Sequence, residues 1–220
     1  MSGDEARDAI LGAVDAATDA VRDGDPDAAH ATLARDYRSV GALDGAARLD
    51  RFEGRLVDYG VDVVRLRAAD VADALGARLD RRRAAHVVVP RGTPDAWRPA
   101  FAGRTTVRDD APHDALEAAD ATVSGCAVAV AETGTIALDG GPGMGRRAAS
   151  LLPDVHLCVV RASQVVELLP EAQARLQEAA AAGAPITWIS GPSATSDIEL
   201  ERVAGVHGPR TLVVLLVEDA

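Results

Sequence analysis

Short apolar runs alternate along most of the chain with stretches in which apolar residues recur every three to four positions. The runs have the length of buried strands, and the three-to-four spacing is typical of helices with one buried face. Because parallel strands need crossover connections, this alternation predicts an α/β fold: an open, mostly parallel sheet flanked by helices. Pro170 is expected to kink or divide the last helix. Strands are predicted at 61–66, 86–89, 105–107, 121–130, 135–138, 155–160, 186–190 and 212–217, and helices at 49–59, 69–82, 115–119 and 163–182.

The first part of the chain has a different pattern, with helical periodicity and no strand-like run. Residues 4–23 are predicted to form a helix with Ile10, Leu11 and Val14 on one stripe. A second helix is predicted from Pro26 to about Tyr37. We therefore predict an N-terminal helical segment at 1–40, serving as a cap or an oligomer contact, and an α/β domain at 41–220.

Composition narrows the classes of protein and partner. The 220 residues, 48% of them hydrophobic, suffice for one substantial core. A net charge of −11 argues against a nucleic-acid partner, because phosphate contacts need clustered cations. No apolar run has the length of a membrane span, and the acidic N-terminus is unlike a secretory signal, so we expect a cytoplasmic protein. All 23 basic residues are Arg, and acidic residues are in excess, which favours a halophilic host.

The distribution of cysteine and histidine residues gives no pattern of metal ligands. Cys126 and Cys158 lie inside apolar runs, where buried thiols are the ordinary outcome. An iron–sulfur cluster needs about four thiolates, so we expect none in this chain. The five histidines are scattered, and their spacing indicates no zinc site. We predict no metal and no resident cofactor.

Glu132 follows the most continuous apolar run, and Gly134 stands two residues later. A carboxylate at the carboxyl end of a strand lies where sheets of this class present reactive groups, and it suits acid–base chemistry. The same residues fit a hairpin turn equally well, with Gly134 at a positive φ and Glu132 hydrogen-bonded to the backbone. Both interpretations remain open for Glu132 and its neighbours Thr133 and Thr135.

A glycine-rich loop at 140–145 leads into Arg146 and Arg147. Residues 143–148 match G-x-G-x-x-A, but Arg161 stands where a dinucleotide site needs an acidic residue, so that class of site is disfavoured. Backbone amides and two arginines still suit an anion such as phosphate or carboxylate. The alternative is a surface loop with solvated arginines.

The segment 186–199 reads as a strand, a Gly-Pro turn and the start of a short helix. Ser196 and Glu199 have the spacing of a capping box, which accounts for both side chains. A serine, Asp197 and His207 are the residue types of a hydrolytic triad, but no G-x-S-x-G motif accompanies them. We therefore expect a ligand-binding turn here, without a nucleophilic serine.

This C-terminal block resembles the signature of the lactate utilization protein C family, the LUD domain. Two further matches to that family are Ala131-Glu132-Thr133-Gly134-Thr135-Ile136 and the run Arg147…Ser150-Leu151-Leu152-Pro153…His156. The resemblance implies the fold shared by ribose-phosphate isomerase, glucosamine-phosphate deaminase and the CoA transferases. It also implies ligand contacts, which together with the candidates above are Thr133, Gly134, Thr135, Arg146, Arg147, Gly191, Pro192, Ser193, Thr195, Asp197, Glu199, His207 and Arg210.

The family implies a role in oxidising L-lactate to pyruvate within a three-component iron–sulfur system. The component resembled here lacks the clusters, which would lie on partner subunits, and it would bind a small carboxylate or phosphate or dock to those partners. Two alternatives remain. The first is an acyl or CoA transferase with Glu132 as nucleophile, since Glu132-Thr133-Gly134 is similar to the transferase pattern. The second is a metabolite-binding sensor.

Overall fold

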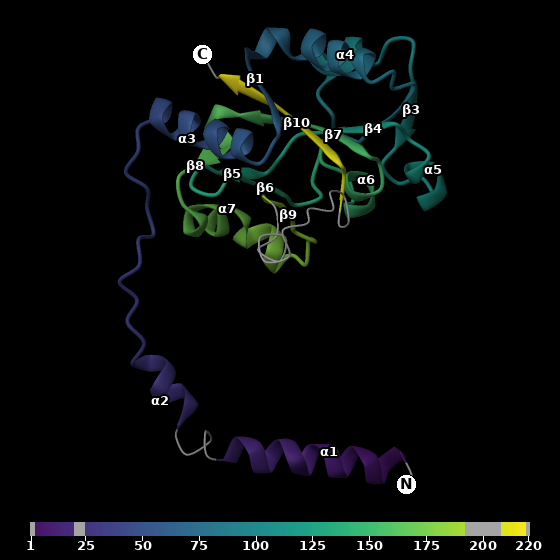
Figure 1. The fold of residues 1–220 in the computed structure, drawn as a ribbon. Coiled ribbons are helices and arrows are strands. Elements are labelled where there is room, and N and C mark those ends of the chain that lie inside the picture. Colours follow the sequence, from purple (N-terminus) through teal and green to yellow (C-terminus); the bar gives the residue numbers. More distant parts are fainter. Residues whose placement is uncertain (1–2, 20–24, 192–207, 219–220) are drawn as a thin grey trace. The chain divides into compact units, whose positions relative to one another are not determined.

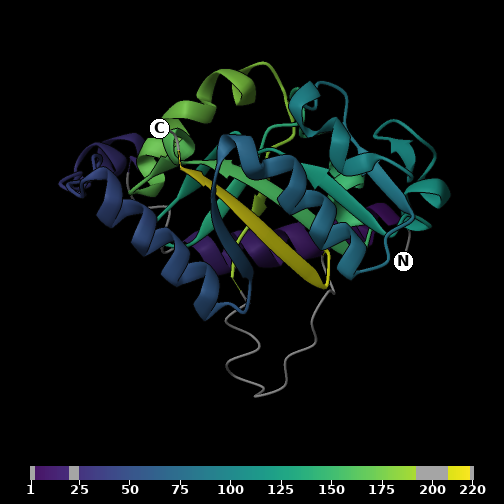
Figure 2. The same cartoon turned by 90° about the horizontal axis from the view of Figure 1, so that it is seen from above.

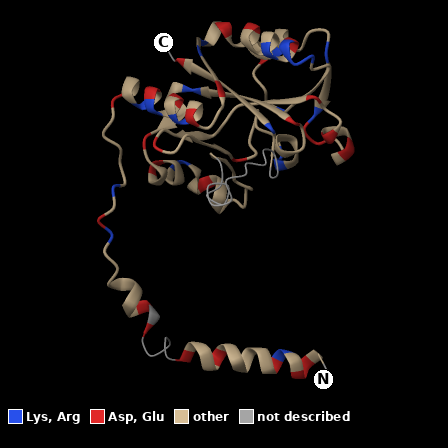
Figure 3. Ribbon diagram, viewed as in Figure 1, with Lys and Arg blue, Asp and Glu red and all other residues tan. Residues whose placement is uncertain are grey.

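A computed structural model of the protein describes residues 3–19, 25–191 and 208–218. The chain divides into two compact units, Met1–Arg38 and Ser39–Ala220. Acidic and arginine positions are interspersed over the helices and loops of the second unit (Figure 3).

The N-terminal unit contains two helices, α1 (Gly3–Thr18) and α2 (Pro26–Ala31) (Figure 1). The apolar stripe of α1 is exposed within this unit. Asp25 caps α2 by accepting a hydrogen bond from the backbone of Asp27 at 2.9 Å. The prediction that this helix continues to Tyr37 is wrong. Its last turn is closed by Thr32, whose backbone and side chain both donate to the carbonyl of Ala29, which competes with further helical bonding.

The larger unit is built on a six-stranded sheet in which every neighbouring pair is parallel. This confirms the predicted α/β class. Its central strands are apolar on both faces because both faces are covered, as is typical of parallel sheets. The strands, in spatial order, are β1 (Asp62–Arg67), β10 (Thr211–Glu218), β7 (Val155–Arg161), β4 (Ala121–Ser124), β2 (His86–Val89) and β3 (Thr105–Arg108).

A second sheet of four short strands was not predicted. Within it, β5 and β6 form an antiparallel hairpin, β6 pairs antiparallel with β9, and β5 pairs parallel with β8. Its strands, in spatial order, are β8 (Val165–Val166), β5 (Val128–Val130), β6 (Thr135–Leu138) and β9 (Thr187–Ile189).

The single strand predicted at 121–130 is in fact two strands that belong to different sheets. β4 ends at Ser124, and Gly125 then donates to the carbonyl of Gly143 at 2.9 Å. Ala127 donates to Ala137 at 2.9 Å, which starts the pairing of the second sheet. Backbone partners distant in sequence therefore end one strand and begin the next, although the apolar run continues through both.

The helix predicted at 163–182 begins six residues later than expected. A 3-10 turn (η4, Ala162–Gln164) and strand β8 precede it, and the helix proper is α7 (Leu169–Ala181). Pro170 lies in the first turn of α7, where its missing N–H is tolerated, and it does not kink the helix. Glu171 accepts from the backbone of Leu168 at 2.8 Å and so caps the start.

Four layers stack in the larger unit, and alternate side chains of β10 show the two faces of the central sheet. Val213 and Leu215 pack with α4 (Val71–Arg81), whereas Val214 and Leu216 pack with the four-stranded sheet and α3 (Gly45–Asp58). Helix α7 covers the outer face of the second sheet. Figure 1 shows α4 above the sheets and α7 below them, and Figure 2 shows the same layers from above, with β10 running across the view. The remaining short elements are η2 (Ala68–Asp70), η3 (Asp95–Phe101), α5 (His113–Glu117) and α6 (Arg147–Leu151).

Candidate functional site

Residues 131–134 form the turn of the β5–β6 hairpin. Gly134 has a φ of 63°, and a Cβ there would lie 2.8 Å from the Cβ of Arg55. The backbone N–H of Glu132 donates to the carbonyl of Glu167 at 3.0 Å, and its own carbonyl accepts from Arg55 Nε at 3.1 Å. The backbone therefore has the conformation of the hairpin interpretation. Glu132 is half-buried in this turn, and its backbone N–H and carbonyl are both hydrogen-bonded.

Three hydroxyl groups form a hydrogen-bonded chain beside this turn. Thr135 Oγ1 lies 2.8 Å from Thr133 Oγ1 and 2.9 Å from Ser190 Oγ. Pairing of β6 with β9 brings Ser190, some 55 residues distant in sequence, to the hairpin. We call Glu132, Thr133, Thr135 and Ser190 the hairpin cluster. The sequence predicted the first three as site residues and missed Ser190, whose only signal was its position at the end of an apolar run.

Gly191 borders the hairpin cluster and packs against an aromatic ring. A Cβ at Gly191 would lie 2.4 Å from Cζ of Tyr59, so the strand end and the ring are in close contact. The expected site residues Gly134 and Gly191 thus both pack on the C-terminal end of α3. The other expected residues of the C-terminal block lie outside the described residues: Pro192, Ser193, Thr195, Asp197, Glu199 and His207.

The glycine-rich loop at 140–145 packs on the segment that follows β2. Gly143 donates to the carbonyl of Arg91 at 2.7 Å, and its carbonyl accepts from Gly125. Gly92, at a φ of 80°, lies so close to Pro142 that a Cβ would be 2.6 Å from the proline Cβ. The loop therefore supports the end of β2.

The three arginines expected at the site do not converge. Arg146 donates through Nε to the carbonyl of Asp109 at 2.8 Å and through its guanidinium to that of Ala111, which holds the segment after β3. Arg147 is exposed in the first turn of α6. Arg210 is exposed and pairs with Asp154 at 3.3 Å.

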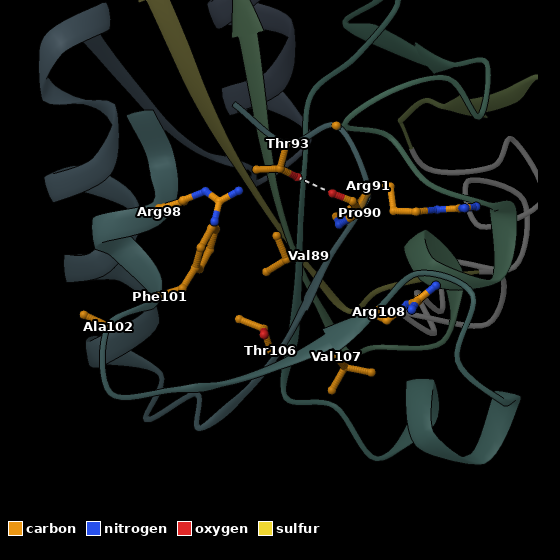
Figure 4. Close-up of a pocket in the computed structure, with 11 residues that line it drawn as sticks. Val89, Pro90, Arg91, Thr93, Arg98, Phe101, Ala102, Thr106, Val107 and Arg108 are labelled. Atoms are coloured by element: carbon orange, nitrogen blue, oxygen red, sulfur yellow. Dashed lines mark hydrogen bonds between the residues drawn. The ribbon is translucent and has the colours of Figure 1, made fainter. Parts of the chain in front are cut away.

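A pocket of about 440 Å³ lies at the carboxyl ends of β2 and β3, and sequence reasoning missed it. Arg98 and Phe101 of η3 flank Val89 on one side, and Arg91 and Arg108 lie on the other (Figure 4). No spacing rule joins three arginines from three separate segments, so no sequence pattern signals this pocket. The full lining is Val89, Pro90, Arg91, Gly92, Thr93, Arg98, Phe101, Ala102, Thr106, Val107 and Arg108.

The core beside the six-stranded sheet contains a buried histidine, His156, and two buried cysteines, Cys126 and Cys158. His156 Nε2 lies 2.7 Å from Ser124 Oγ, and burial lowers the pKa of His156 to about 4, so the ring is neutral at pH 7. Contact with Cys158, together with burial, raises the pKa of the Cys126 thiol well above its ordinary value. The Cys126 thiol is therefore protonated, and burial shields both thiols from reaction.

The described part of the chain contains neither a cluster of metal ligands nor a helix that could span a membrane. No group of three or more His, Cys, Asp or Glu side chains there is placed to hold a metal ion. No helix there combines the length and apolarity needed to cross a membrane.

The stacked sheets, the hairpin cluster and the pocket define a two-sheet α/β protein with candidate sites at strand ends. The chain belongs to the LUD domain family, which it matches over residues 49–217. A lactate utilization protein C of Deinococcus radiodurans is 46% identical over 183 residues, which are 82% of this chain and 84% of that protein. Another, of Halalkalibacterium halodurans, is 37% identical over 107 residues, 47% of this chain and 46% of that protein. A crystal structure of a DUF162 family protein from Deinococcus radiodurans is 40% identical, with a TM-score of 0.70 over 80% of this chain and 99% of that one.

Proposed function

We propose that this protein is a cluster-free subunit of an iron–sulfur system that oxidises L-lactate, acting in the cytoplasm. The observation that carries the proposal is the 46% identity, over most of both chains, to a protein named for lactate utilization. The clusters are proposed to lie on partner subunits, because this chain has two cysteines and both are buried, whereas a cluster needs about four thiolates.

We place the small-molecule ligand of this subunit, a carboxylate or phosphate, at the hairpin cluster. Hydroxyl groups donate to anionic oxygens, and Thr133, Thr135 and Ser190 already form one connected chain. The carboxylate of Glu132 supplies an acceptor in the same turn, which suits a ligand that carries a hydroxyl beside its acidic group. The predicted contacts from Gly191 to His207 belong to this proposal as well.

Lactate-dependent dye reduction tests the role in lactate oxidation. Extracts of a host strain that lacks this chain are compared with extracts supplemented with the purified protein, and growth on L-lactate is compared with growth on pyruvate. We expect dye reduction and growth on L-lactate to be lost without the chain and restored by it, with growth on pyruvate unchanged. Full lactate-dependent activity without the chain would overturn the proposal.

Variants of the hairpin cluster then separate ligand binding from docking to partners. Glu132→Ala removes the carboxylate while keeping the backbone bonds of the turn. A ligand role predicts a chain that folds and still associates with the iron–sulfur subunits but does not restore dye reduction. If the Glu132→Ala variant restores dye reduction fully, the chain acts by docking to its partners, and the hairpin cluster is not its ligand site.

One observation favours an acyl-transferring alternative: Glu132 stands in a fixed turn beside Thr133 and Gly134. In that reaction the Glu132 carboxylate attacks the thioester carbonyl and releases CoA thiolate, which can then attack the Glu132 carbonyl of the anhydride to give a Glu132-CoA thioester and a free carboxylate. The test is incubation with acetyl-CoA followed by hydroxylamine and mass spectrometry of the peptide containing residue 132. A hydroxamate at Glu132 would favour transfer, and an unmodified peptide would exclude it for that thioester.

A further inference from the structure

We call the pocket at the carboxyl ends of β2 and β3 the arginine pocket. Its lining is positively charged, whereas the protein as a whole is acidic. Its lining contains Arg91, Arg98 and Arg108 and no acidic residue, although the chain as a whole carries a net charge of −11. Clustered arginines around one hollow attract anions, and their planar guanidinium groups match the geometry of carboxylate and phosphate.

Each of these side chains pairs with an acidic residue outside the lining, and Arg91 Nε lies 3.7 Å from Asp109. Arg98 Nε donates to Asp95 at 2.7 Å, and Arg108 donates twice to Asp110, at 2.9 and 2.6 Å. Within the described residues, the two terminal nitrogens of Arg98 make no other hydrogen bond. The guanidinium of Arg98 is therefore held by its Nε edge, which leaves its terminal N–H groups as donors for a ligand.

The two strand ends that carry Arg91 and Arg108 are held in place before any ligand arrives. The nearly fully buried Asp109 accepts from the backbone N–H of Arg91 at 3.2 Å, which ties the two segments together. Gly143 holds the carbonyl of Arg91, and Arg146 holds the segment after β3. Preorganised donors of this kind lose little conformational entropy on binding.

The pocket also lies at the end of the sheet where ligands of this class of fold bind. From β2 the chain first adds β3 on one side and later places β4 on the other side, so the direction of winding reverses between β2 and β4. Ligands of open α/β sheets bind outside the carboxyl ends of the strands. The arginine pocket lies at the carboxyl ends of β2 and β3, on the other side of β2 from that reversal.

The lining also indicates the shape of the ligand. Val89, Phe101 and Val107 supply an apolar surface between the arginines, and a volume of about 440 Å³ falls within the ~300–1,000 Å³ typical of small-molecule sites. We propose that the arginine pocket binds a small anion through its carboxylate or phosphate groups, and that the apolar surface accommodates the carbon skeleton of an organic ligand. This inference stands apart from the role in lactate oxidation, because it concerns a different site and is tested on the isolated chain.

Calorimetric titration of the purified full-length protein tests the proposal, with citrate as the carboxylate probe and pyrophosphate as the phosphate probe. Ionic strength is fixed at about 0.15 M with KCl, so that screening is equal in every titration. We expect one-to-one binding of at least one probe, and which probe binds more tightly identifies the acidic group. Binding of neither probe would overturn the proposal.

A matched pair of arginine variants locates the binding. Arg98 and Arg67 each pair with an aspartate three residues away, Arg98 with Asp95 at 2.7 Å and Arg67 with Asp70 at 2.9 Å, and both are largely exposed. Arg98→Ala is expected to weaken probe binding at least about tenfold, whereas Arg67→Ala leaves it unchanged. Equal weakening by the two variants would show that binding is nonspecific and would overturn the assignment.

A fluorescence readout keeps the test valid if Arg98→Ala does not fold. The chain has two tryptophans, and Trp97 lies in η3 next to Arg98. In the Trp188→Phe variant, Trp97 is the remaining tryptophan and reports on the pocket. Its emission is expected to change with probe concentration along the calorimetric isotherm, and the conservative variant Arg98→Lys is expected to bind more weakly. Binding without any change in Trp97 emission would place the probe elsewhere.

Discussion

The hairpin cluster and the arginine pocket are both built where strands end, but they differ in how the chain assembles them. The hairpin cluster draws three of its four side chains from one tight turn of the four-stranded sheet, and its polar groups are mainly hydroxyls. The arginine pocket draws its cations from three separate segments at the edge of the six-stranded sheet. A contiguous site leaves a motif in the sequence, whereas a site assembled by topology does not.

Both sites rely on a glycine at a positive φ in a crowded position. Gly134 packs against Arg55 and Tyr59 beside the hairpin cluster, and Gly92 packs against Pro142 beside the arginine pocket. In each case the backbone approaches a neighbour more closely than a Cβ permits. A glycine-to-alanine substitution at either position, which adds one methyl group, should therefore perturb one region without the other.

The largest expected effect concerns the acid stability of the two sheets. The strands of the four-stranded sheet carry no ionisable side chain in the described residues, whereas the six-stranded sheet contains the buried His156. Burial lowers the pKa of His156 from 6.5 to about 4. Between these values the unfolded chain binds a proton that the folded protein does not, so the free energy of unfolding falls as the pH falls. The loss from this group reaches about 3 kcal/mol by pH 4.

Urea unfolding at pH values from about 7.5 down to about 4.5 measures this effect. His156→Gln keeps a hydrogen-bonding group near Ser124 but does not titrate. Between pH 6.5 and 4 the wild-type protein is expected to lose about 1.4 kcal/mol per pH unit more than the variant. Asp120, whose pKa is lowered by the backbone N–H groups of His86 and Ala85, contributes equally to both proteins. Parallel pH profiles would contradict the assignment to His156.

Gly92→Ala is expected to have the next largest effect and to act on the arginine pocket. The added Cβ would lie 2.6 Å from the Cβ and 2.9 Å from the Cα of Pro142, at a φ of 80°. We expect a loss of about 2 to 3 kcal/mol in the free energy of unfolding and weaker citrate or pyrophosphate binding. Gly103→Ala is the control, because Gly103 has a φ of 75° in open space, and about 1 kcal/mol is expected there from backbone strain alone. Equal losses would mean that the contact with Pro142 is not needed.

Gly134→Ala tests the hairpin cluster in the same way. The added Cβ would lie 2.8 Å from the Cβ of Arg55, which the backbone of α3 fixes, and 3.2 Å from a ring carbon of Tyr59, so the expected loss is about 2 kcal/mol. Gly183→Ala, at a φ of 80° with nothing within 4 Å, is the control. Restoration of lactate-dependent dye reduction is expected to suffer while probe binding in the arginine pocket is kept. Loss of both would show that the two sites are coupled.

The same contrast explains how much of the fold the sequence predicted. The strands at 86–89 and 135–138 were found with the predicted bounds, because buried strands of this fold are short apolar runs between polar residues. The division of 121–130 into β4 and β5 was not predicted, since the break depends on pairing with Gly143 and Ala137.

A two-residue strand such as β8 carries too little pattern to be separated from the helix that follows it. In the candidate site, Glu132, Thr133 and Thr135 share one motif and were predicted to act together. Ser190 and Arg98 reach their sites through strand order and loop packing, which a single sequence does not encode as spacing. The likeness to the ribose-phosphate isomerase group of folds and the N-terminal domain boundary at residue 40 stay predictions.

The smallest expected effects come from removing single hydroxyl groups of the hairpin cluster. Thr135→Val keeps the volume of a buried side chain but removes the oxygen that bonds both Thr133 and Ser190, so about 1 kcal/mol of unfolding free energy is expected to be lost. Thr133→Val removes only the hydrogen bond between Thr133 and Thr135, from a half-buried position, and a loss of about 0.5 kcal/mol is expected.

If the hairpin cluster binds the ligand, both variants reduce the restoration of dye reduction by more than their stability loss explains, because donors to the ligand are gone. Citrate or pyrophosphate binding stays at the wild-type level in both variants, since no residue of the hairpin cluster lines the arginine pocket. A stability loss with full restoration of dye reduction would make the hydroxyl chain a purely structural feature of the β6–β9 pairing and would leave the arginine pocket as the better-supported ligand site.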